Sequence, residues 1–527
     1  MAKSRILIVD DEESNINLIQ KLLSDKNYEI DSSLSGHEAI KMIKLKKYDL
    51  VLLDIFMPQI NGYEVCRSIH TIAPDIYVIM LTGLSDDEAL KKSFEVGAVD
   101  CIRKPLNETE LISRIKNILN IKSTEEKVKN LYVELLKDLD MASDVQAYLI
   151  PEWIHLDRKL QVSSIYEASQ KVSGDIFDII RVSEHRHIVY MGDISGHGVQ
   201  AALLMTAVKS VINLLINSMK DNLELYRILN RLNKLLIEEL LHKNYLSILI
   251  SLVDTEENTI TYFNAGHPPM IEYNTITKTA KTIQDKGGMP IGWIASVEYL
   301  ESETNVIPLD PDCTYLMYTD GVFECDDKDG NLLGLDGFIN MVNDMRDCGD
   351  VAIIPYSIKF KLLDLGYNCN LDDFSLLSLS KADERKDYQH FFKINPLLHH
   401  VAEVGDQIKA ITKEKTKNDK LAVMIELVIN EFLNNIIIHG INHNRRNDSK
   451  IYVNINFEEK IIITFWDKGV EWNPENVDFD DPFKDENDVF AVSGRGIKII
   501  YSVASSFDRK RIGEVNETKI TIKNELE

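Results

Sequence analysis

The chain has 527 residues, and 59 Lys and Arg against 84 Asp and Glu give it a net charge of −25 at pH 7. This acidic balance argues against sequence-independent nucleic-acid binding, which needs a basic surface to neutralise phosphates. It also argues against adhesion to an anionic membrane surface. At roughly 150 residues per domain, the length suggests three or four domains, and the 44% share of hydrophobic residues is typical of globular ones.

Membrane and export signals are absent from the pattern. No uninterrupted apolar run reaches the roughly 18 residues that a membrane helix needs. The first residues turn acidic after one short apolar run, unlike a signal peptide. The six cysteines form no C-x-x-C pair. We therefore expect reduced thiols in a cytoplasmic protein.

Residues 1–121 alternate between strand-like and helix-like segments. Amphipathic stretches such as 15–23 and 37–47 separate the apolar runs. Strand and helix in alternation indicate a doubly wound α/β domain with a parallel sheet. The five strands are expected at 6–9, 28–33, 49–55, 77–83 and 100–104.

Polar residues stand at the carboxyl ends of four of these strands: Asp10 and Asp11 end the first, Asp54 the third, Thr82 the fourth and Lys104 the fifth. In an open parallel sheet these ends meet at one edge, where ligands bind. Three carboxylates make an oxygen cage suited to Mg²⁺, and a lysine with a hydroxyl can hold a phosphoryl group.

The motifs VDDEE, LLDIFMP, LTG and RKP resemble the receiver domain of two-component response regulators. The resemblance implies that a histidine kinase or phosphotransfer protein phosphorylates Asp54. It also implies that Asp10, Asp11 and Asp54 hold Mg²⁺, together with the carbonyl of Phe56.

The same resemblance gives Thr82 and Lys104 the role of reading the phosphoryl group. Cys101 departs from the family, because this position on the fifth strand usually carries an aromatic switch residue. The coupling of Thr82 to an aromatic side chain is therefore not expected here in its usual form.

Residues 122–149 contain no Gly or Pro and are rich in Lys, Glu and Leu, which favours a helical linker. Two alternatives stay open: a two-stranded coiled coil, which makes the chain a homodimer, or one amphipathic helix packed on its neighbour. The rough heptad, which Asp138 interrupts, consists of Val128, Leu131, Leu135, Ala142, Val145 and Leu149.

Residues 150–380 mix strands with two helical stretches, which indicates an α+β domain. Four acidic motifs follow or begin strands: VSGDIFD, MGDISGHG, YTDGVFE and LDDFSLL. An Asp-Gly pair alone is usually a turn. Four in this order, with glycines that let the backbone approach a ligand, fit carboxylates around two divalent ions that activate a water.

This set resembles the SpoIIE/RsbU branch of the PPM metal-dependent Ser/Thr phosphatases. The resemblance implies a pair of Mn²⁺ or Mg²⁺ ions bridged by Asp193, with the carbonyl of Ile194. Asp175, Asp320 and Asp372 complete the two sites. The implied substrate is phosphoserine or phosphothreonine on a STAS-domain anti-anti-sigma factor.

Four further residues of these motifs have weaker roles. Asp178 and Asp373 are less secure candidates for the metal sites. His197 and His267 are either acids or ligands, or structural residues of Gly-flanked turns. The resemblance supplies no phosphate-gripping arginine.

Residues 390–527 indicate a second, smaller α+β sandwich. Glu431 and Asn435, four apart on a long helix, share one face. Asp467 ends a strand in an Asp-Lys-Gly turn, where it can accept a hydrogen bond from an adenine. Gly494 and Gly496 open a helix, whose N-terminal N–H groups can bind phosphate.

These three features, in this order along the chain, resemble the GHKL ATPases, specifically the anti-sigma-factor serine kinases of the SpoIIAB/RsbW type. The resemblance makes Glu431 the base that activates a substrate serine and Asn435 the Mg²⁺ ligand. Asp467, Gly469, Gly494 and Gly496 then bind ATP. The acidic segment 473–493 would be the ATP lid, and the first glycine motif is thin, with Val and Glu after Gly469.

The sequence therefore predicts a cytoplasmic two-component regulator of a partner-switching pathway. One output removes phosphate from a STAS-domain anti-anti-sigma factor, and the other returns it with ATP, both biased by phosphorylation of Asp54. The alternative is a regulated phosphatase whose C-terminal domain sequesters a partner, such as a sigma or anti-sigma factor, with little kinase activity.

Overall fold

The computed structural model divides the chain into two compact units, Met1–Asp138 and Leu139–Glu527. Each unit has hydrophobic cores of its own. The residues that the structure describes are 3–24, 26–83, 87–156, 159–196, 198–219, 223–239, 244–345, 351–382, 390–441, 450–457, 459–471 and 493–523.

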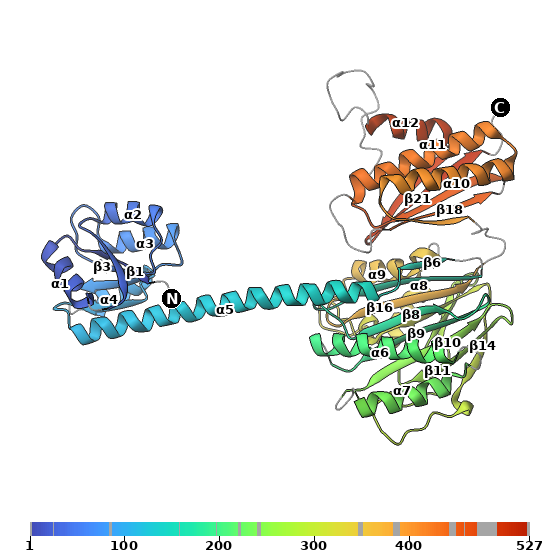
Figure 1. The fold of residues 1–527 in the computed structure, drawn as a ribbon, viewed down its shortest axis with the longest axis horizontal. Coiled ribbons are helices and arrows are strands. Elements are labelled where there is room, and N and C mark those ends of the chain that lie inside the picture. The colour runs from blue at the N-terminus through green and yellow to red at the C-terminus, as the bar shows by residue number, and fades with distance from the viewer. Residues whose placement is uncertain are drawn as a thin grey trace. The chain divides into compact units, whose positions relative to one another are not determined.

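The first unit contains a five-stranded parallel sheet in the order β2-β1-β3-β4-β5 (Figure 1). Helices cover both faces of the sheet, so the central strand β3 is buried along its whole length. The predicted doubly wound α/β fold is confirmed. Its elements are β1 (Ser4–Val9), α1 (Glu13–Leu23), β2 (Tyr28–Ser33), α2 (Gly36–Leu45), β3 (Leu50–Asp54), α3 (Gly62–Ile72), β4 (Tyr77–Thr82), α4 (Asp87–Glu95) and β5 (Asp100–Arg103).

The last helix of this unit, α5 (Glu108–Leu149), is one continuous helix of 42 residues. No Gly or Pro interrupts it, so the backbone shows no break at the predicted boundary between 121 and 122. A row of large apolar side chains on α5 is exposed to solvent. These side chains are Ile121, Val128, Leu131, Tyr132, Val133, Leu135, Met141, Val145 and Tyr148.

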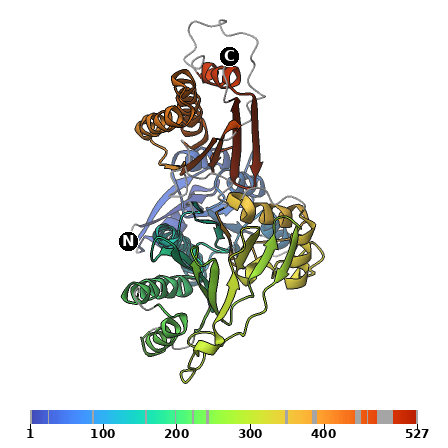
Figure 2. The same cartoon turned by 90° about the vertical axis from the view of Figure 1, so that its right-hand side faces the viewer.

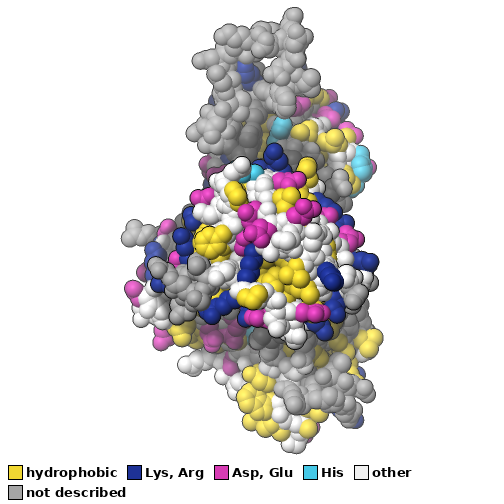
Figure 3. Space-filling view, turned by 90° about the vertical axis from the view of Figure 1, so that its left-hand side faces the viewer, with side chains coloured by type: hydrophobic (Ala, Val, Ile, Leu, Met, Phe, Trp, Pro, Cys, Tyr) yellow, Lys and Arg dark blue, Asp and Glu magenta, His cyan; other side chains and the backbone are white. Residues whose placement is uncertain are grey.

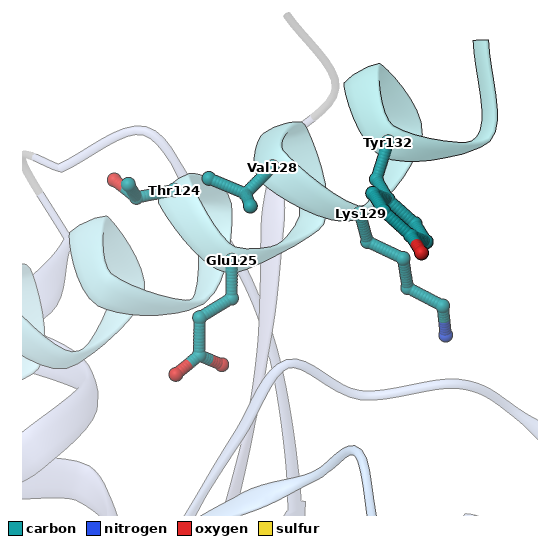
Figure 4. Close-up of a pocket in the computed structure, with 5 residues that line it drawn as sticks. All are labelled: Thr124, Glu125, Val128, Lys129 and Tyr132. Atoms are coloured by element: carbon teal, nitrogen blue, oxygen red, sulfur yellow. The ribbon is translucent and has the colours of Figure 1, made fainter. Parts of the chain in front are cut away.

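Charged side chains of both signs are mixed on the face of the receiver unit that Figure 3 shows, with exposed hydrophobic side chains between them. On α5, a pocket is lined by Thr124, Glu125, Val128, Lys129 and Tyr132, whose side chains project from successive turns (Figure 4). Because one helix supplies all five residues, the pocket lies along the helix surface.

The second unit begins with a sandwich of two antiparallel sheets, β14-β11-β10-β9-β8 and β13-β12-β15-β16-β7-β6. A core of Val, Leu, Met and aromatic side chains fills the space between the sheets. Helices α6 and α7 cover the first sheet, and α8 and α9 cover the second (Figure 2). The result is an α+β domain, as the sequence predicts.

The sequence analysis expected two helical stretches here, and the described residues of the sandwich form those two, α6 and α7, and two more, α8 and α9. The elements of the sandwich are β6 (Ile154–Leu156), β7 (Leu160–Glu167), β8 (Asp175–Arg181), β9 (Arg186–Ile194), α6 (Val199–Ser218), α7 (Leu225–Glu239), β10 (Leu246–Asp254), β11 (Thr259–Ala265), β12 (Ile271–Asn274), β13 (Thr279–Thr282), η1 (Glu301–Glu303), β14 (Asn305–Pro308), β15 (Cys313–Tyr318), η2 (Asp320–Val322), α8 (Gly334–Asp344), η3 (Val351–Ile353), α9 (Ile354–Asp364) and β16 (Phe374–Lys381).

The C-terminal part of this unit is an antiparallel sheet, β17-β18-β19-β21-β20, with α10, α11 and α12 on one face. The opposite face presents Tyr452, Trp466 and Val515 to a core shared with the phosphatase-like sandwich. Its elements are β17 (Phe391–Ile394), α10 (Leu398–Thr416), α11 (Asp419–Asn435), the π-helical η4 (Ile436–Ile441), β18 (Ile451–Phe457), β19 (Lys460–Asp467), α12 (Ser493–Val503), β20 (Ser506–Ile512) and β21 (Val515–Lys523).

Two helical segments, Val199–Ser218 and Asp419–Ile441, are long and apolar enough to cross a membrane by length and composition alone. Each packs apolar side chains into a domain core, and Ile212 and Ile429 are fully buried there. Core helices of soluble proteins meet the same criterion, so this is weak evidence for a membrane span. Polar residues interrupt both segments, so neither is an uninterrupted apolar run in the sequence.

The cysteines that the structure describes are all buried free thiols. This agrees with the expectation of reduced cysteines. Cys348 lies outside the described residues.

Candidate functional site

Three carboxylates meet at the carboxyl edge of the receiver sheet. Oxygens of Asp10, Asp11 and Asp54 lie within 4.8 Å of one another. Lys104 Nζ lies 2.8 Å from Asp10 Oδ2 and 2.9 Å from Asp54 Oδ1. Burial raises the pKa of Asp54 above its usual value, although Lys104 opposes this. A group of acids that one lysine neutralises only in part fits a divalent cation such as Mg²⁺.

The backbone around Asp54 leaves no room for a side chain at Gly62. A Cβ atom there would lie 2.2 Å from the carbonyl oxygen of Asp54. Thr82 is buried at the end of β4, and its carbonyl accepts a hydrogen bond of 2.7 Å from the N–H of Lys104. Cys101 is buried on β5, where burial raises the pKa of its thiol. The predicted residues thus share one edge of the sheet.

In the phosphatase-like sandwich, Asp175 and Asp193 are direct cross-strand partners in the antiparallel pair β8–β9. Burial, together with the charges of Asp320, Asp372 and Asp373, raises the pKa of Asp193 to about 7. Burial and the charge of Asp193 also raise the pKa of Asp175 well above its usual value. Such accumulated negative charge is what a pair of divalent cations would neutralise.

Glu324 joins this group, and the sequence analysis assigned it no role. Carboxylate oxygens of Asp320, Glu324 and Asp372 lie within 4.8 Å of one another. Burial, then the charges of Asp372 and Glu324, raise the pKa of Asp320 to about 6. The signal was present in YTDGVFE, because residues four apart around a helical turn lie on one side.

The carbonyl of Ile194 lies close to Gly174, in the loop before Asp175. A Cβ atom at Gly174 would lie 3.0 Å from the Ile194 oxygen and 3.3 Å from Asp193 Oδ1, so a larger residue would crowd both groups. Asp175 Oδ2 accepts hydrogen bonds from Thr319 Oγ1 at 3.0 Å and from Ser375 Oγ at 2.5 Å. These hydroxyls fix the orientation of the buried carboxylate.

The two less secure candidates have other partners. Asp178 Oδ2 lies 2.9 Å from Nζ of the buried Lys209. Because side chains alternate along a strand, Asp178 faces away from Asp175. Asp373 accepts hydrogen bonds from the N–H and hydroxyl of Ser169 and from the N–H of Gly174. Asp373 therefore orders the loop that leads to Asp175.

His267 is held within its turn. Its N–H donates to Asn264 Oδ1 at 2.8 Å, and its Nδ1 lies 2.9 Å from Ser247 Oγ. Burial lowers the pKa of His267 to about 3, which favours the neutral imidazole. These contacts agree with the structural alternative. His197 lies outside the described residues.

A second residue that the sequence reasoning missed is Gln146, in the last turns of α5. Its Nε2 donates to the Ser173 carbonyl at 2.7 Å, and its Oε1 accepts from the Ser173 N–H at 3.1 Å. Ser173 Oγ in turn accepts from the N–H of Asp175 at 3.0 Å. The end of the linker helix is thus hydrogen-bonded to the loop that leads to Asp175.

In the ATPase-like domain, Glu431 and Asn435 lie on the half-buried face of α11. Asp467 is fully buried at the end of β19. Its Oδ1 accepts from the Gly469 N–H and from Asn516 Nδ2, both at 2.8 Å. Its Oδ2 accepts no hydrogen bond, although the guanidinium Nη1 of Arg509 lies 3.6 Å away as an ion pair. A buried carboxylate oxygen that accepts no hydrogen bond fits the amino group of an adenine.

Gly494 and Gly496 stand in the first turn of α12, so the predicted phosphate-binding glycines are at a helix N-terminus. Asn435 Nδ2 is also buried without a hydrogen-bond partner. The predicted ATP lid, 473–493, lies almost wholly outside the described residues.

Comparison with protein families finds three domains in the predicted order. Residues 6–116 match the response regulator receiver domain, 183–381 match stage II sporulation protein E (SpoIIE), and 394–523 match the histidine kinase-like ATPase domain. Two features of the sequence analysis lie outside the three matches: the heptad pattern of residues 128–149 and the motif VSGDIFD, which precedes the second match.

Among curated proteins, the transcriptional regulatory protein CpxR homolog of Haemophilus influenzae is 38% identical over 116 residues, 22% of this chain and 50% of the relative. The chain spans between 45% and 68% of the length of curated relatives such as this one.

Two solved structures resemble longer parts of the chain. The RsbU and RsbW domains of a Mycobacterium tuberculosis protein are 16% identical and cover 69% of this chain and 93% of that one, with a TM-score of 0.39. The SiaA-PP2C domain of Pseudomonas aeruginosa is 18% identical and covers 47% of this chain and 98% of that one, with a TM-score of 0.40. The domain assignment rests on the three family models.

Proposed function

Because the chain belongs to the response regulators that combine a receiver with a SpoIIE-type phosphatase domain and a histidine kinase-like ATPase domain, we propose that it sets the phosphorylation state of a STAS-domain anti-anti-sigma factor. The phosphatase domain removes phosphate from a serine or threonine of that partner. The ATPase domain returns phosphate to it from ATP. A histidine kinase or phosphotransfer protein supplies the input at Asp54.

The cluster around Asp193 carries the phosphatase part of this proposal. Asp193, Asp320 and Asp372 would hold the two cations, Asp175 and the Ile194 carbonyl would complete the sites, and Glu324 adds a carboxylate. Bound Mn²⁺ or Mg²⁺ would supply a metal-activated water for attack on phosphorus. Asp373 and Gln146 position the loop around Asp175 through hydrogen bonds to Gly174 and Ser173.

The kinase part rests on Asp467 and α11. Oδ2 of Asp467, which accepts no hydrogen bond and lies 3.6 Å from Nη1 of Arg509, would accept the adenine amino group. Asn435 would hold Mg²⁺, and Glu431 on the same helix would take the proton from the attacking serine. The binding-module alternative keeps the same fold but phosphorylates no serine.

Control by the receiver acts through α5 in this proposal. The helix leaves the receiver and ends, without interruption, at the hydrogen bonds of Gln146. A kinase and a phosphatase in one chain form a futile cycle unless their balance is biased, and phosphorylation of Asp54 would supply that bias. The exposed apolar row on α5 supports homodimerisation through this helix.

The test follows the intact mass of a STAS-domain partner that this chain binds. One sample contains ATP and Mg²⁺ and the other contains Mn²⁺ without ATP, each with and without beryllofluoride. The proposal expects the gain of one phosphate in the first sample, its loss in the second, and opposite responses to beryllofluoride. Loss without any gain would favour the binding-module alternative, and equal rates with and without beryllofluoride would refute control by the receiver.

A further inference from the structure

The short segment that follows α5 contacts the ATPase domain by a pair of ionic interactions. The carboxylate of Glu152 binds the ammonium groups of Lys393 on β17 and of Lys450, next to β18. Burial would raise the pKa of Glu152, but hydrogen bonds from these two lysines lower it below its usual value. Glu152 is therefore a charged link between the end of the linker helix and the ATPase sheet.

The next residue, Trp153, lies between the two catalytic domains. Its side chain is only 4% exposed. Its ring packs edge-to-face against Tyr356 of α9, with centroids 5.4 Å apart, and against Tyr452 of β18, 5.3 Å apart. Aromatic pairs in this geometry are attractive and directional, so Trp153 fixes α9 of the phosphatase domain against β18 of the ATPase domain.

Lys468, next to the proposed adenine-binding Asp467, also contacts Trp153 at the junction of the two domains. Its Nζ lies 5.3 Å from the ring centroids of both Trp153 and Tyr356, which is within the range of a cation–π interaction. Side chains alternate at the end of β19: Trp466 faces the shared core, and Asp467 faces the ATPase interior. The main chain therefore joins the proposed adenine acceptor directly to a side chain in the phosphatase junction.

Gln146 lies seven residues before Trp153 and is hydrogen-bonded to the backbone of Ser173 beside the metal-site acids. We propose that the segment from Gln146 to Trp153 couples the two catalytic sites, so that nucleotide bound at Asp467 changes the phosphatase through the contact of Lys468 with Trp153. This inference rests on the proposed binding of ATP by the C-terminal domain. Coupling between two binding equilibria is reciprocal, so a nucleotide that changes the Mn²⁺ affinity by some factor has its own affinity changed by Mn²⁺ by that factor.

The experiment uses the full chain with a non-hydrolysable ATP analogue and Mg²⁺. Hydrolysis of p-nitrophenyl phosphate with Mn²⁺ is measured with and without the analogue, and binding of the analogue is measured in parallel by calorimetry. We expect the analogue to change the rate threefold or more in the wild type and by less than 1.5-fold in Lys468→Met. Trp153→Phe, which keeps an aromatic ring, should retain part of the effect.

Lys460→Met is the matched control, because Lys460 is an exposed lysine at the start of β19, the strand that Lys468 directly follows. It should respond to the analogue like the wild type. Binding of the analogue without a change in phosphatase rate would refute the coupling while leaving the ATP site standing. No binding at all would refute the ATP site and the coupling together. A wild-type response that persists in Lys468→Met would refute the assigned contact.

Discussion

Gln146 satisfies both backbone hydrogen-bonding groups of Ser173, as donor to its carbonyl at 2.7 Å and as acceptor from its N–H at 3.1 Å. The contact is buried and joins residues 27 positions apart. Because Ser173 Oγ also binds the N–H of Asp175, the side chain at 146 determines where that acid lies.

Replacement Gln146→Ala should lower the phosphatase rate at least tenfold. Two buried backbone groups lose their partners, at about 1–3 kcal/mol each, and a shift of the metal loop by a fraction of an ångström weakens metal binding. The rate with Mn²⁺ and the Mn²⁺ affinity are both measured. Asp144→Ala, on the exposed side of the same helix, should behave as wild type. A Gln146→Ala chain with full activity would show that Ser173 needs no support from α5.

Replacement of a metal-site acid should abolish the phosphatase. Asp193→Ala and Asp320→Ala each remove a carboxylate from the cluster, and we expect less than a few per cent of the Mn²⁺- or Mg²⁺-dependent rate with an unchanged circular dichroism spectrum. Asp329→Ala, in an exposed turn, serves as the control. More than a few per cent of residual activity would reject the metal assignment.

Metal affinity should depend on pH. The pKa values of about 7 for Asp193 and about 6 for Asp320 mean that both acids take up protons as the pH falls from 8 to 5. Cations bind the deprotonated carboxylates, so the Mn²⁺ affinity should fall by about tenfold per pH unit for each proton displaced. Titration calorimetry at several pH values measures this. The same raised pKa values destabilise the metal-free fold as the pH rises through 6–7, so the increase in Tm caused by Mn²⁺ should be largest near pH 8.

Phosphorylation of the receiver should require Asp54 but not Thr82. With acetyl phosphate and Mg²⁺, Asp54→Asn should gain no phosphate by intact mass, and Asp75→Asn, an exposed acid, should gain one. Thr82→Ala should still be phosphorylated, while its phosphatase rate should no longer respond to phosphorylation of Asp54. A response that survives in Thr82→Ala would assign the switch to another residue.

Dimerisation should depend on the apolar row of α5. The double change Leu131→Asp and Leu135→Asp places charges among exposed apolar side chains, and light scattering at micromolar concentration should then give the mass of one chain. Wild type and Asn130→Asp, which adds one charge on the polar side of the helix, should give the mass of two chains. A monomeric wild type would favour the single amphipathic helix.

Much of the fold followed from local patterns. Alternating strands and helices identify the receiver, because apolar periodicity and strand-end acids are properties of short segments. The same local reasoning could have predicted that Glu324 lies beside Asp320. It could also have predicted that Asp178 lies apart from Asp175, since a strand places residues 175 and 178 on opposite faces.

The sequence by itself determined the order of the domains and most of the acids that meet in each site, because each motif follows or begins a strand and strand ends converge. The tertiary structure alone decided that Asp373 orders a loop, that Gln146 binds Ser173, and that Lys468 rests on Trp153. These contacts join residues 27 to 315 positions apart. Only the packing of whole helices and strands brings such residues together, and the periodicity of the sequence does not predict which of these elements pack against one another.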